Sequence, residues 1–185
     1  MDAFALWMFV VVIGGGFVGW QYRDTIVQEI VRFVNLQSIN KTKLNDRLEQ
    51  YVADLSHRGL LGSMVYEIDP KTNLINAIAA KTTGSNAPLQ THLDKHMKQD
   101  QNMPLLLNDD VSVVMIKAIM QQEPQWFPKK LSTGEDGWLL IVSVPPIRGN
   151  RPVGFVIAIV PATVSDLERD YILFRTSTFA YNLID

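Results

Sequence analysis

The sequence predicts an α+β fold, in which an antiparallel sheet is flanked by helices and follows a single transmembrane helix and an amphipathic stalk helix. Three observations lead to this prediction. Residues 3–20 contain no charged side chain. Residues 138–144 and 153–160 are apolar at nearly every position, as in strands that are covered on both faces. Short polar turns join neighbouring apolar segments, as antiparallel hairpins require. The predicted parts are a transmembrane anchor (1–22), a juxtamembrane stalk (23–42) and an α+β domain (43–185).

The charge-free segment 3–20 is long enough to cross a bilayer. As a helix it would be about 27 Å long, close to the roughly 30 Å thickness of the hydrocarbon core. A cleaved signal peptide is the alternative, but this segment has neither a basic start nor a small-residue cleavage site. A buried core helix would show a polar face, and none interrupts the run. Aromatic and basic side chains that favour the membrane interface lie at its ends: Trp7, Trp20, Tyr22 and Arg23.

Glycines in the anchor predict close packing of membrane helices. Gly15 and Gly19 have the small-xxx-small spacing that lets two helix backbones approach each other, which indicates a homo-oligomer in the lipid bilayer. The orientation stays open. Basic residues after the anchor would keep the domain in the cytoplasm, whereas the short amino-terminal tail allows either mode of insertion. These basic residues are Arg23, Arg32, Lys41 and Lys43.

Two amphipathic stretches follow the anchor. Apolar residues at helical spacing predict the stalk helix: Ile26, Val27, Ile30, Val31 and Val34. A second stripe predicts a helix that begins after a Thr42 N-cap and ends before Gly59: Leu44, Leu48, Tyr51, Val52 and Leu55. This second stripe either packs on the sheet of the domain or forms the seam of a dimer.

The middle of the chain begins with a hairpin. Residues 63–69 and 74–80 are predicted strands, because the turn 70–73 contains Pro, Lys, Thr and Asn. Residues 89–98 predict a polar surface helix with Pro88 in its first turn. A further helix follows Asn108, with this buried stripe: Val111, Val114, Met115, Ala118 and Ile119.

The last part of the chain completes the sheet and ends in a helix. Pro128 restricts the strand of Trp126 and Phe127 to an edge of the sheet. Residues 138–144 and 153–160 are predicted to be its central strands, joined by a hairpin loop. Ser165 and Glu168 form a capping box that begins the final helix. Its expected packing residues are Leu167, Tyr171, Phe174, Phe179 and Leu183.

Composition excludes several classes of function. Lys and Arg number 17 against 19 Asp and Glu, and a net charge of -2 argues against a nucleic-acid partner. With 0 Cys, the chain has no disulfide, no thiolate zinc site, no iron–sulfur cluster and no thiol nucleophile. No Gly-x-Ser-x-Gly elbow is present. We therefore predict no catalytic residue, no cofactor and no enzymatic activity.

Two groups of residues are the candidates for a ligand or metal site. His92 and His96 are four residues apart and would share one helix face. No zincin glutamate lies between them and no third ligand is evident, so we expect no metal site. Trp126, Phe127 and Trp138 could line a ligand cavity, and the alternative is that they belong to the core.

The layout of residues 43–185 resembles the PAS/GAF/Cache group of sensor-like domains. The segment 137–161 carries most of this resemblance, because a strand pair with a glycine near the start of its second strand, here Gly154, recurs in such domains. The resemblance implies a fold, not a ligand. It also offers an alternative function, a membrane-anchored ligand-sensing or adaptor domain that acts through a partner protein.

A narrower resemblance is to the T-type holins of T-even-like bacteriophages. The residues that suggest it are Val65-Tyr66, Pro70-Lys71, the strand 74–80, the strand at Gly154 and the helix start at Leu167-Glu168. Membership would imply a single-pass protein of the bacterial inner membrane with a periplasmic domain. It would also imply that the protein oligomerises into membrane lesions and that the domain binds an antiholin or another regulatory protein. The holin is the main functional hypothesis, and a holin acts without catalysing a reaction.

Overall fold

The structure is a computed structural model that describes residues 38–69, 71–72, 74–84, 86–104, 117–118, 121–146 and 152–184. All of these residues belong to one unit, Gln37–Asp185. The predicted anchor, most of the stalk and the residues assigned to membrane contacts lie outside the described residues: Trp7, Gly15, Gly19, Trp20, Tyr22 and Arg23. No helix in the described ranges is long and apolar enough to cross a membrane.

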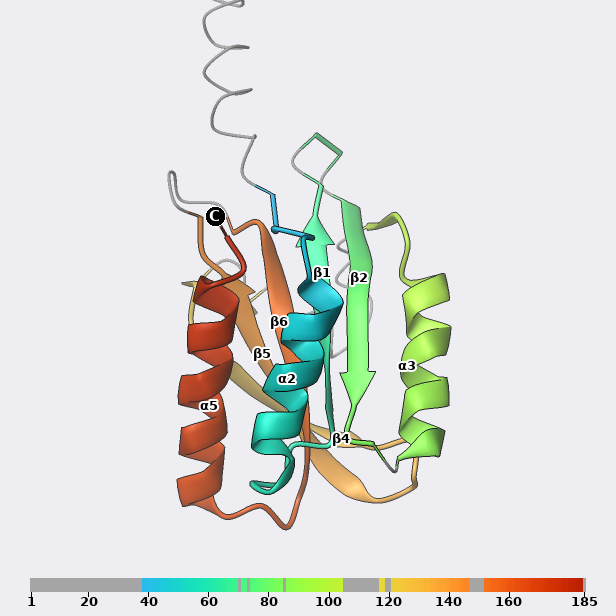
Figure 1. The fold of residues 1–185 in the computed structure, drawn as a ribbon, viewed down its shortest axis with the longest axis vertical. Helices are drawn as coiled ribbons and strands as arrows, with labels where there is room; N and C mark the ends of the chain where they lie inside the picture. The colour runs from blue at the N-terminus through green and yellow to red at the C-terminus, as the bar shows by residue number, and fades with distance from the viewer. Residues whose placement is uncertain are drawn as a thin grey trace, which may run out of the picture. The chain divides into compact units, whose positions relative to one another are not determined.

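Six strands form one antiparallel sheet in the described part of the chain (Figure 1). The strand order is β3-β2-β1-β6-β5-β4, and every neighbouring pair is antiparallel. The strands are β1 (Gly62–Ile68), β2 (Leu74–Thr82), β3 (Met103–Pro104), β4 (Gln125–Lys130), β5 (Asp136–Val144) and β6 (Gly154–Pro161). The predicted hairpin is confirmed as β1 and β2. The central position of β6 and the edge position of β4 are also confirmed.

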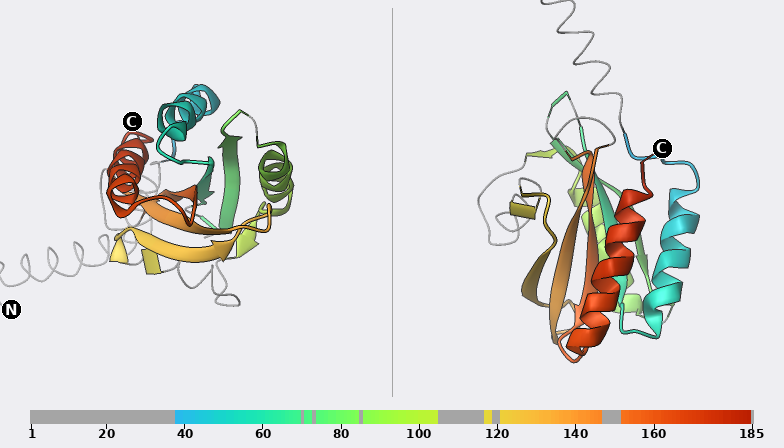
Figure 2. Two further views of the ribbon diagram at one scale, coloured as in Figure 1. Left: turned by 90° about the horizontal axis from the view of Figure 1, so that it is seen from below. Right: turned by 90° about the vertical axis from the view of Figure 1, so that its left-hand side faces the viewer.

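The described helices lie on both sides of this sheet. Helices α2 (Leu44–Ser56) and α5 (Asp166–Tyr181) lie side by side on one face, as both Figure 1 and Figure 2 show. Helix α3 (Ala87–Gln99) lies on the other side, next to β2. The fold is therefore α+β, with a curled antiparallel sheet and flanking helices, as the sequence predicts.

Alternation along the strands separates the core into two clusters. On β6, Val156 and Ala158 belong to the cluster beneath α2 and α5, whereas Phe155 and Ile157 belong to the cluster on the α3 side. This follows from strand geometry, because successive side chains point to opposite faces. The apolar stripe predicted for α2 is buried in the first cluster, which confirms that it packs within the domain: Leu44, Leu48, Tyr51, Val52 and Leu55.

Helices α2 and α5 differ in whether the predicted residue caps the N-terminus. Lys43, not Thr42, is the N-cap of α2, because the Asn40 side chain accepts a hydrogen bond from the Thr42 amide at 2.8 Å and so forms a turn before the helix. The capping box of α5 is confirmed. The Ser165 hydroxyl oxygen accepts a hydrogen bond from the Glu168 amide at 3.3 Å and donates to its carboxylate at 3.1 Å.

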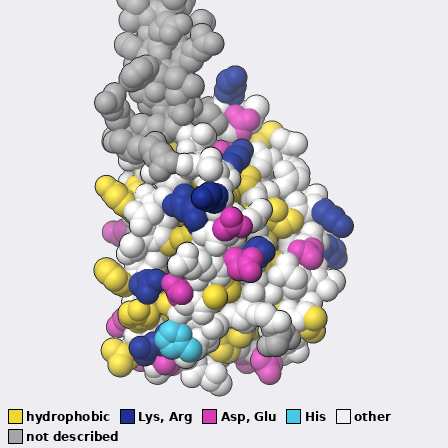
Figure 3. Space-filling view, viewed as in Figure 1, with side chains coloured by type: hydrophobic (Ala, Val, Ile, Leu, Met, Phe, Trp, Pro, Cys, Tyr) yellow, Lys and Arg dark blue, Asp and Glu magenta, His cyan; other side chains and the backbone are white. Residues whose placement is uncertain are grey.

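The predicted packing face of α5 is largely wrong. Leu167 is 80% exposed and Phe174 is 65% exposed, and Tyr171 is exposed as well. The buried stripe of the helix consists of Ile172, Thr176 and Ala180, which are four apart on one face. Of the predicted residues, Leu183 is buried after the helix and Phe179 packs against the cluster beneath α2 and α5, as expected. Figure 3 shows hydrophobic side chains exposed along the α5 side of the domain.

The first and last described segments lie at one end of the domain. The Asn40 amide donates a hydrogen bond to the Leu183 carbonyl oxygen at 2.9 Å, and the Arg47 guanidinium donates to the carbonyl oxygen of Asn182. Ile39 is buried in the cluster beneath α2 and α5. Its side chain packs over Gly154, where a Cβ atom would clash with both Ile39 and the Tyr66 carbonyl oxygen.

Candidate functional site

A cavity of about 370 Å³ lies between α3 and the sheet. Strands β1, β5 and β6 contribute its apolar floor, and α3 contributes its wall. The edge strand β4 and the residues after it add polar and charged side chains. The lining residues are Met64, Tyr66, Leu89, His92, Leu93, His96, Asp100, Met103, Lys129, Lys130, Leu131, Ser132, Leu139, Ile157 and Ile159.

Local sequence places the α3 side chains around the cavity. The Asn86 side chain caps the helix by accepting a hydrogen bond from the Leu89 amide at 3.2 Å. Leu89 and Leu93 are four residues apart and both buried. His92 and His96 are also four residues apart. His92 precedes Leu93 by one residue and His96 follows Leu93 by three, so both histidines lie beside this apolar stripe. Their rings meet edge to face with centroids 4.6 Å apart.

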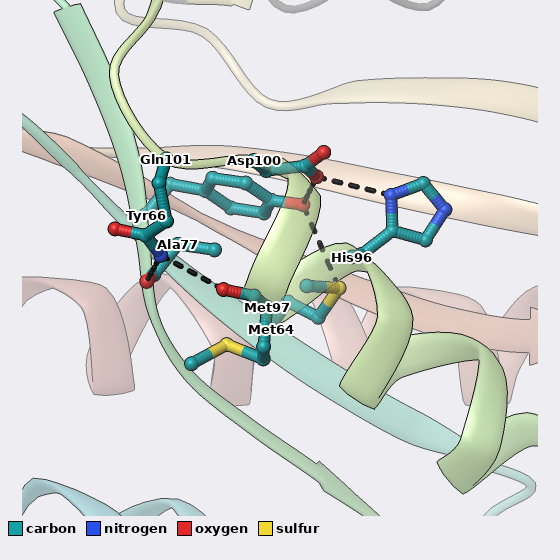
Figure 4. A network of polar contacts seen from close by, with 7 residues as sticks. All are labelled: Met64, Tyr66, Ala77, His96, Met97, Asp100 and Gln101. Atoms are coloured by element: carbon teal, nitrogen blue, oxygen red, sulfur yellow. Dashed lines mark hydrogen bonds and ion pairs between the residues drawn. The ribbon is translucent and has the colours of Figure 1, made fainter.

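A polar cluster at the end of α3 joins the helix to β1 (Figure 4). The Tyr66 hydroxyl donates a hydrogen bond to Asp100 Oδ2 at 2.8 Å. The same carboxylate oxygen lies 3.0 Å from His96 Nδ1. Asp100 is buried, and such a carboxylate needs partners of this kind to offset the loss of hydration. The cluster therefore provides ordered polar groups in a largely apolar cavity.

Backbone hydrogen bonds fix the position of Asp100. Its carbonyl oxygen accepts a hydrogen bond from the Ala77 amide at 2.8 Å. The Gln101 side-chain amide donates to the carbonyl oxygens of Ala77 at 2.7 Å and Met97 at 2.9 Å. The Asn102 amide donates to the Asn76 side chain at 2.8 Å. The chain is thus fastened to β2 directly after α3, which limits the movement of the carboxylate.

Burial and charge set the protonation of the cavity side chains. Burial raises the pKa of the Tyr66 hydroxyl, and the adjacent Asp100 carboxylate raises it further, so Tyr66 stays a neutral donor. Partial burial lowers the pKa of His92, although its side chain is exposed. His96 when protonated, Lys95 and Lys129 lower the pKa of His92 further, and Asp100 opposes them. The neutral imidazole is therefore the favoured form of His92 at pH 7.

The aromatic residues predicted to line a cavity lie elsewhere. Trp126 and Trp138 pack against the cluster beneath α2 and α5, on the opposite face of the sheet. The Arg169 guanidinium of α5 lies over both indoles, 4.9 Å from the Trp126 ring centroid and 4.7 Å from that of Trp138. Phe127 is partly exposed on β4. None of the three predicted residues lines the cavity described above.

Sequence reasoning missed most of this site. His92 and His96 were considered as metal ligands, and their shared helix face was the available signal for a site. The described residues contain no group of three or more potential metal ligands. Tyr66 and Asp100 carried no local signal, because 34 positions separate them in the sequence. Lys129 belongs to β4, for which the sequence predicts a place at the edge of the sheet but no contact with a cavity.

The chemistry of these residues suits reversible binding. The cavity has apolar walls and few convergent polar groups, which is typical of sites for small molecules. The chain has 0 Cys, so a thiol cannot attach a ligand covalently. The ordered donors and acceptors are the Tyr66–Asp100–His96 cluster, with His92 and the two lysines of β4 nearby.

Comparisons with known proteins give matches among solved structures. No protein-family model and no curated protein matches the sequence. The GAF domain of PixJ from Thermosynechococcus elongatus, in its blue-light absorbing form, is 14% identical with a TM-score of 0.45, covering 79% of this chain and 89% of its own. A LOV protein from Rhodobacter sphaeroides is 12% identical with a TM-score of 0.42, covering 78% and 87%.

A third solved structure is also similar to this chain. The GAF domain from an Acinetobacter phosphoenolpyruvate-protein phosphotransferase is 14% identical with a TM-score of 0.43, covering 86% of this chain and 93% of its own. None of these three proteins is a holin. These matches state similarity only, and the antiparallel sheet with flanking helices is established by the strand pairing of this chain itself.

Proposed function

We propose that this protein is a sensory domain that binds a small organic molecule between α3 and the sheet, and that residues 3–20 anchor it in a membrane. The cavity of about 370 Å³ is the observation that supports binding. This volume lies within the range of roughly 300–1,000 Å³ that small-molecule pockets occupy. We expect the ligand to bind without a thioether or other covalent bond to cysteine, because the chain has 0 Cys, and without being chemically changed.

The contact between Ile39 and β6 offers a route for output. Tyr66 lines the cavity with its side chain. Its carbonyl oxygen lies on the backbone beside Gly154, where Ile39 packs from the other face. Ile39 lies near the end of the predicted stalk, residues 23–42. A ligand that shifts Tyr66 would therefore alter the packing of the residue where the stalk enters the domain.

Thermal unfolding of the full-length protein in detergent micelles tests this proposal. A panel of small organic molecules should contain compounds that raise the melting temperature, because a ligand that binds only the folded state stabilises it. Met103→Trp should abolish the shift, since Met103 lines the cavity and a larger side chain would fill it. Thr91→Trp is the matched control, because Thr91 is exposed on α3 and does not line the cavity.

Two results would contradict the proposal. One is a panel in which no compound changes the melting temperature of the protein. The other is an equal response of Met103→Trp and the wild-type protein, which would place the bound compound outside the cavity.

The holin hypothesis remains a separate prediction. It depends on Gly15 and Gly19, which lie outside the described residues. Gly15→Leu and Gly19→Leu should alter the timing of lysis when the protein is expressed in a bacterium together with a cytoplasmic endolysin. Unchanged timing in both variants would count against packing of the anchors, and absence of lysis would count against the hypothesis itself.

A further inference from the structure

We infer that the ligand of this cavity carries an anionic group on an apolar body, and that Lys129 and His92 receive the anionic group. The inference rests on the proposed function, because it concerns the same cavity. It deepens that proposal by naming the chemical class of the ligand, and it follows from the charges around the cavity.

Lys129 is a cation with no partner in the described part of the chain. It lines the cavity from the edge strand β4, and it forms no ion pair with any described residue. In the pairing of β4 with β5 it lies opposite Gly137, so no side chain faces it across the strands. Lys130 also lines the cavity, but it lies opposite Asp136. Lys130 forms no ion pair with a described residue either, but the position opposite it carries a carboxylate, so Lys129 is the better placed of the two to receive an anion.

The acidic group of the cavity is already engaged. Asp100 is the single carboxylate among the lining residues. Its Oδ2 accepts the hydrogen bond from Tyr66 at 2.8 Å and lies 3.0 Å from His96 Nδ1. Both contacts hold this carboxylate at one end of the cavity, where it is occupied by groups of the protein itself. The remaining charged lining groups, Lys129 and Lys130, are positive.

His92 lines the same cavity as Lys129. Partial burial lowers the pKa of His92, as do His96 when protonated, Lys95 and Lys129, and Asp100 raises it. An anion bound between His92 and Lys129 would cancel this repulsion. Binding would then raise the pKa of His92 and take up a proton, so the affinity should increase as the pH falls through that pKa.

A matched pair of probes can test the charge preference directly. We would use 4-phenylbutyrate and 4-phenylbutyramide, which share an apolar body and differ in charge. The full-length protein, labelled at its 3 histidines, is studied by imidazole NMR in zwitterionic detergent, with free probe measured by dialysis. Both probes should shift the His92 and His96 signals while His57, which does not line the cavity, stays unchanged. The carboxylate should reach half-saturation at a concentration about fivefold lower than that of the amide, the upper end of what an ion pair with an exposed lysine contributes.

Lysine variants identify the group that receives the anion. Lys129→Met should remove most of the preference for the carboxylate and leave the affinity for the amide unchanged. Lys98→Met is the control, because it makes the same change in net charge at an exposed position on α3 that does not line the cavity. The preference should also weaken in high salt, since exposed charges are screened.

The outcomes separate this inference from the proposed function. Equal half-saturation by acid and amide would overturn the inference and leave the binding function intact. A preference that survives in Lys129→Met would overturn the assignment of the anionic group to Lys129. If neither probe shifts the signals of His92 and His96, and no compound of the panel raises the melting temperature, the proposed function fails together with the inference.

Discussion

Among the residues that the structure describes, the two faces of the sheet differ in how helices cover them. Beneath α2 and α5, apolar side chains from the sheet and both helices form a continuous buried cluster. On the α3 side, the described residues leave a cavity between the helix and the sheet. The same strands supply both faces, because their side chains alternate. The difference therefore comes from the helices: one face carries a closed apolar core, and the other carries the cavity for which binding is proposed.

A buried tyrosine on each face illustrates this difference. Tyr51 of α2 is 2.6 Å from the Thr176 hydroxyl and stacks on Phe179, so it joins α2 to α5. Tyr66 stacks on Phe155 and binds the carboxylate of Asp100. Burial raises the pKa of both hydroxyl groups. The partner of Tyr51 is a neutral hydroxyl in a closed core, whereas the partner of Tyr66 is a carboxylate that His96 also contacts at the edge of a cavity.

The largest effect should come from truncating the closed face. Leu140→Ala removes a fully buried side chain beneath α2 and α5 and should lower the free energy of unfolding by about 2–5 kcal/mol. Leu139→Ala, the neighbouring position, faces the cavity and should cost only about 1 kcal/mol, because its side chain is already partly accessible. Denaturant titration of the full-length variants measures both values. Equal losses would contradict the difference between the faces.

The two tyrosines give the next comparison. Tyr66→Phe leaves the buried Asp100 carboxylate without one of its donors and should cost about 1–3 kcal/mol. Tyr51→Phe should cost about 1 kcal/mol, because the Thr176 hydroxyl still donates to the Ile172 carbonyl oxygen. Only Tyr66→Phe should change the affinity for a cavity ligand, measured by the histidine shifts. A binding defect in Tyr51→Phe would show that the faces are coupled.

A smaller effect should appear in the pH dependence of stability. The folded-state pKa of His92 is depressed, so the unfolded chain binds a proton more readily than the folded domain. The corresponding stability is present above the unfolded-state pKa, about 6.5, and is lost as the pH falls through the folded-state value. His92→Gln should remove this part of the dependence in denaturant titrations at several pH values. An unchanged profile would assign the pH dependence to other groups.

The smallest effect is expected on the outer surface of α5. Phe174→Gln replaces an exposed side chain and should change the free energy of unfolding by less than about 0.5 kcal/mol. The measurement is again denaturant titration. A larger loss would mean that Phe174 is covered in solution, and sedimentation of the protein at several concentrations would then show whether a second copy covers it.

Sequence patterns predicted the elements of the fold more accurately than their packing. The apolar runs of β5 and β6 and the hairpin of β1 and β2 were predicted because strand signals are local. The packing face of α5 was mistaken because its large residues, Leu167 and Phe174, are exposed and its small ones are buried. Size alone does not determine the buried stripe of a helix when it packs close to a neighbouring helix.

The site was harder to predict than the fold for a physical reason. The cavity depends on β1, α3, β4, β5 and β6 meeting around one space, and no local pattern encodes this meeting. The histidine pair on α3 was the visible part of the site. Asp100 is held in the site by its hydrogen bonds with Tyr66 and Ala77, and both are tertiary contacts.

The hydrogen bond between the Asn40 amide and the Leu183 carbonyl oxygen has a practical consequence for protein engineering. It places the two ends of the described unit next to each other, so a short linker could join them without strain. New ends could then be opened at the exposed turn between β1 and β2. Such a circular permutant would keep the cavity while releasing it from its covalent connection to the first residues of the chain.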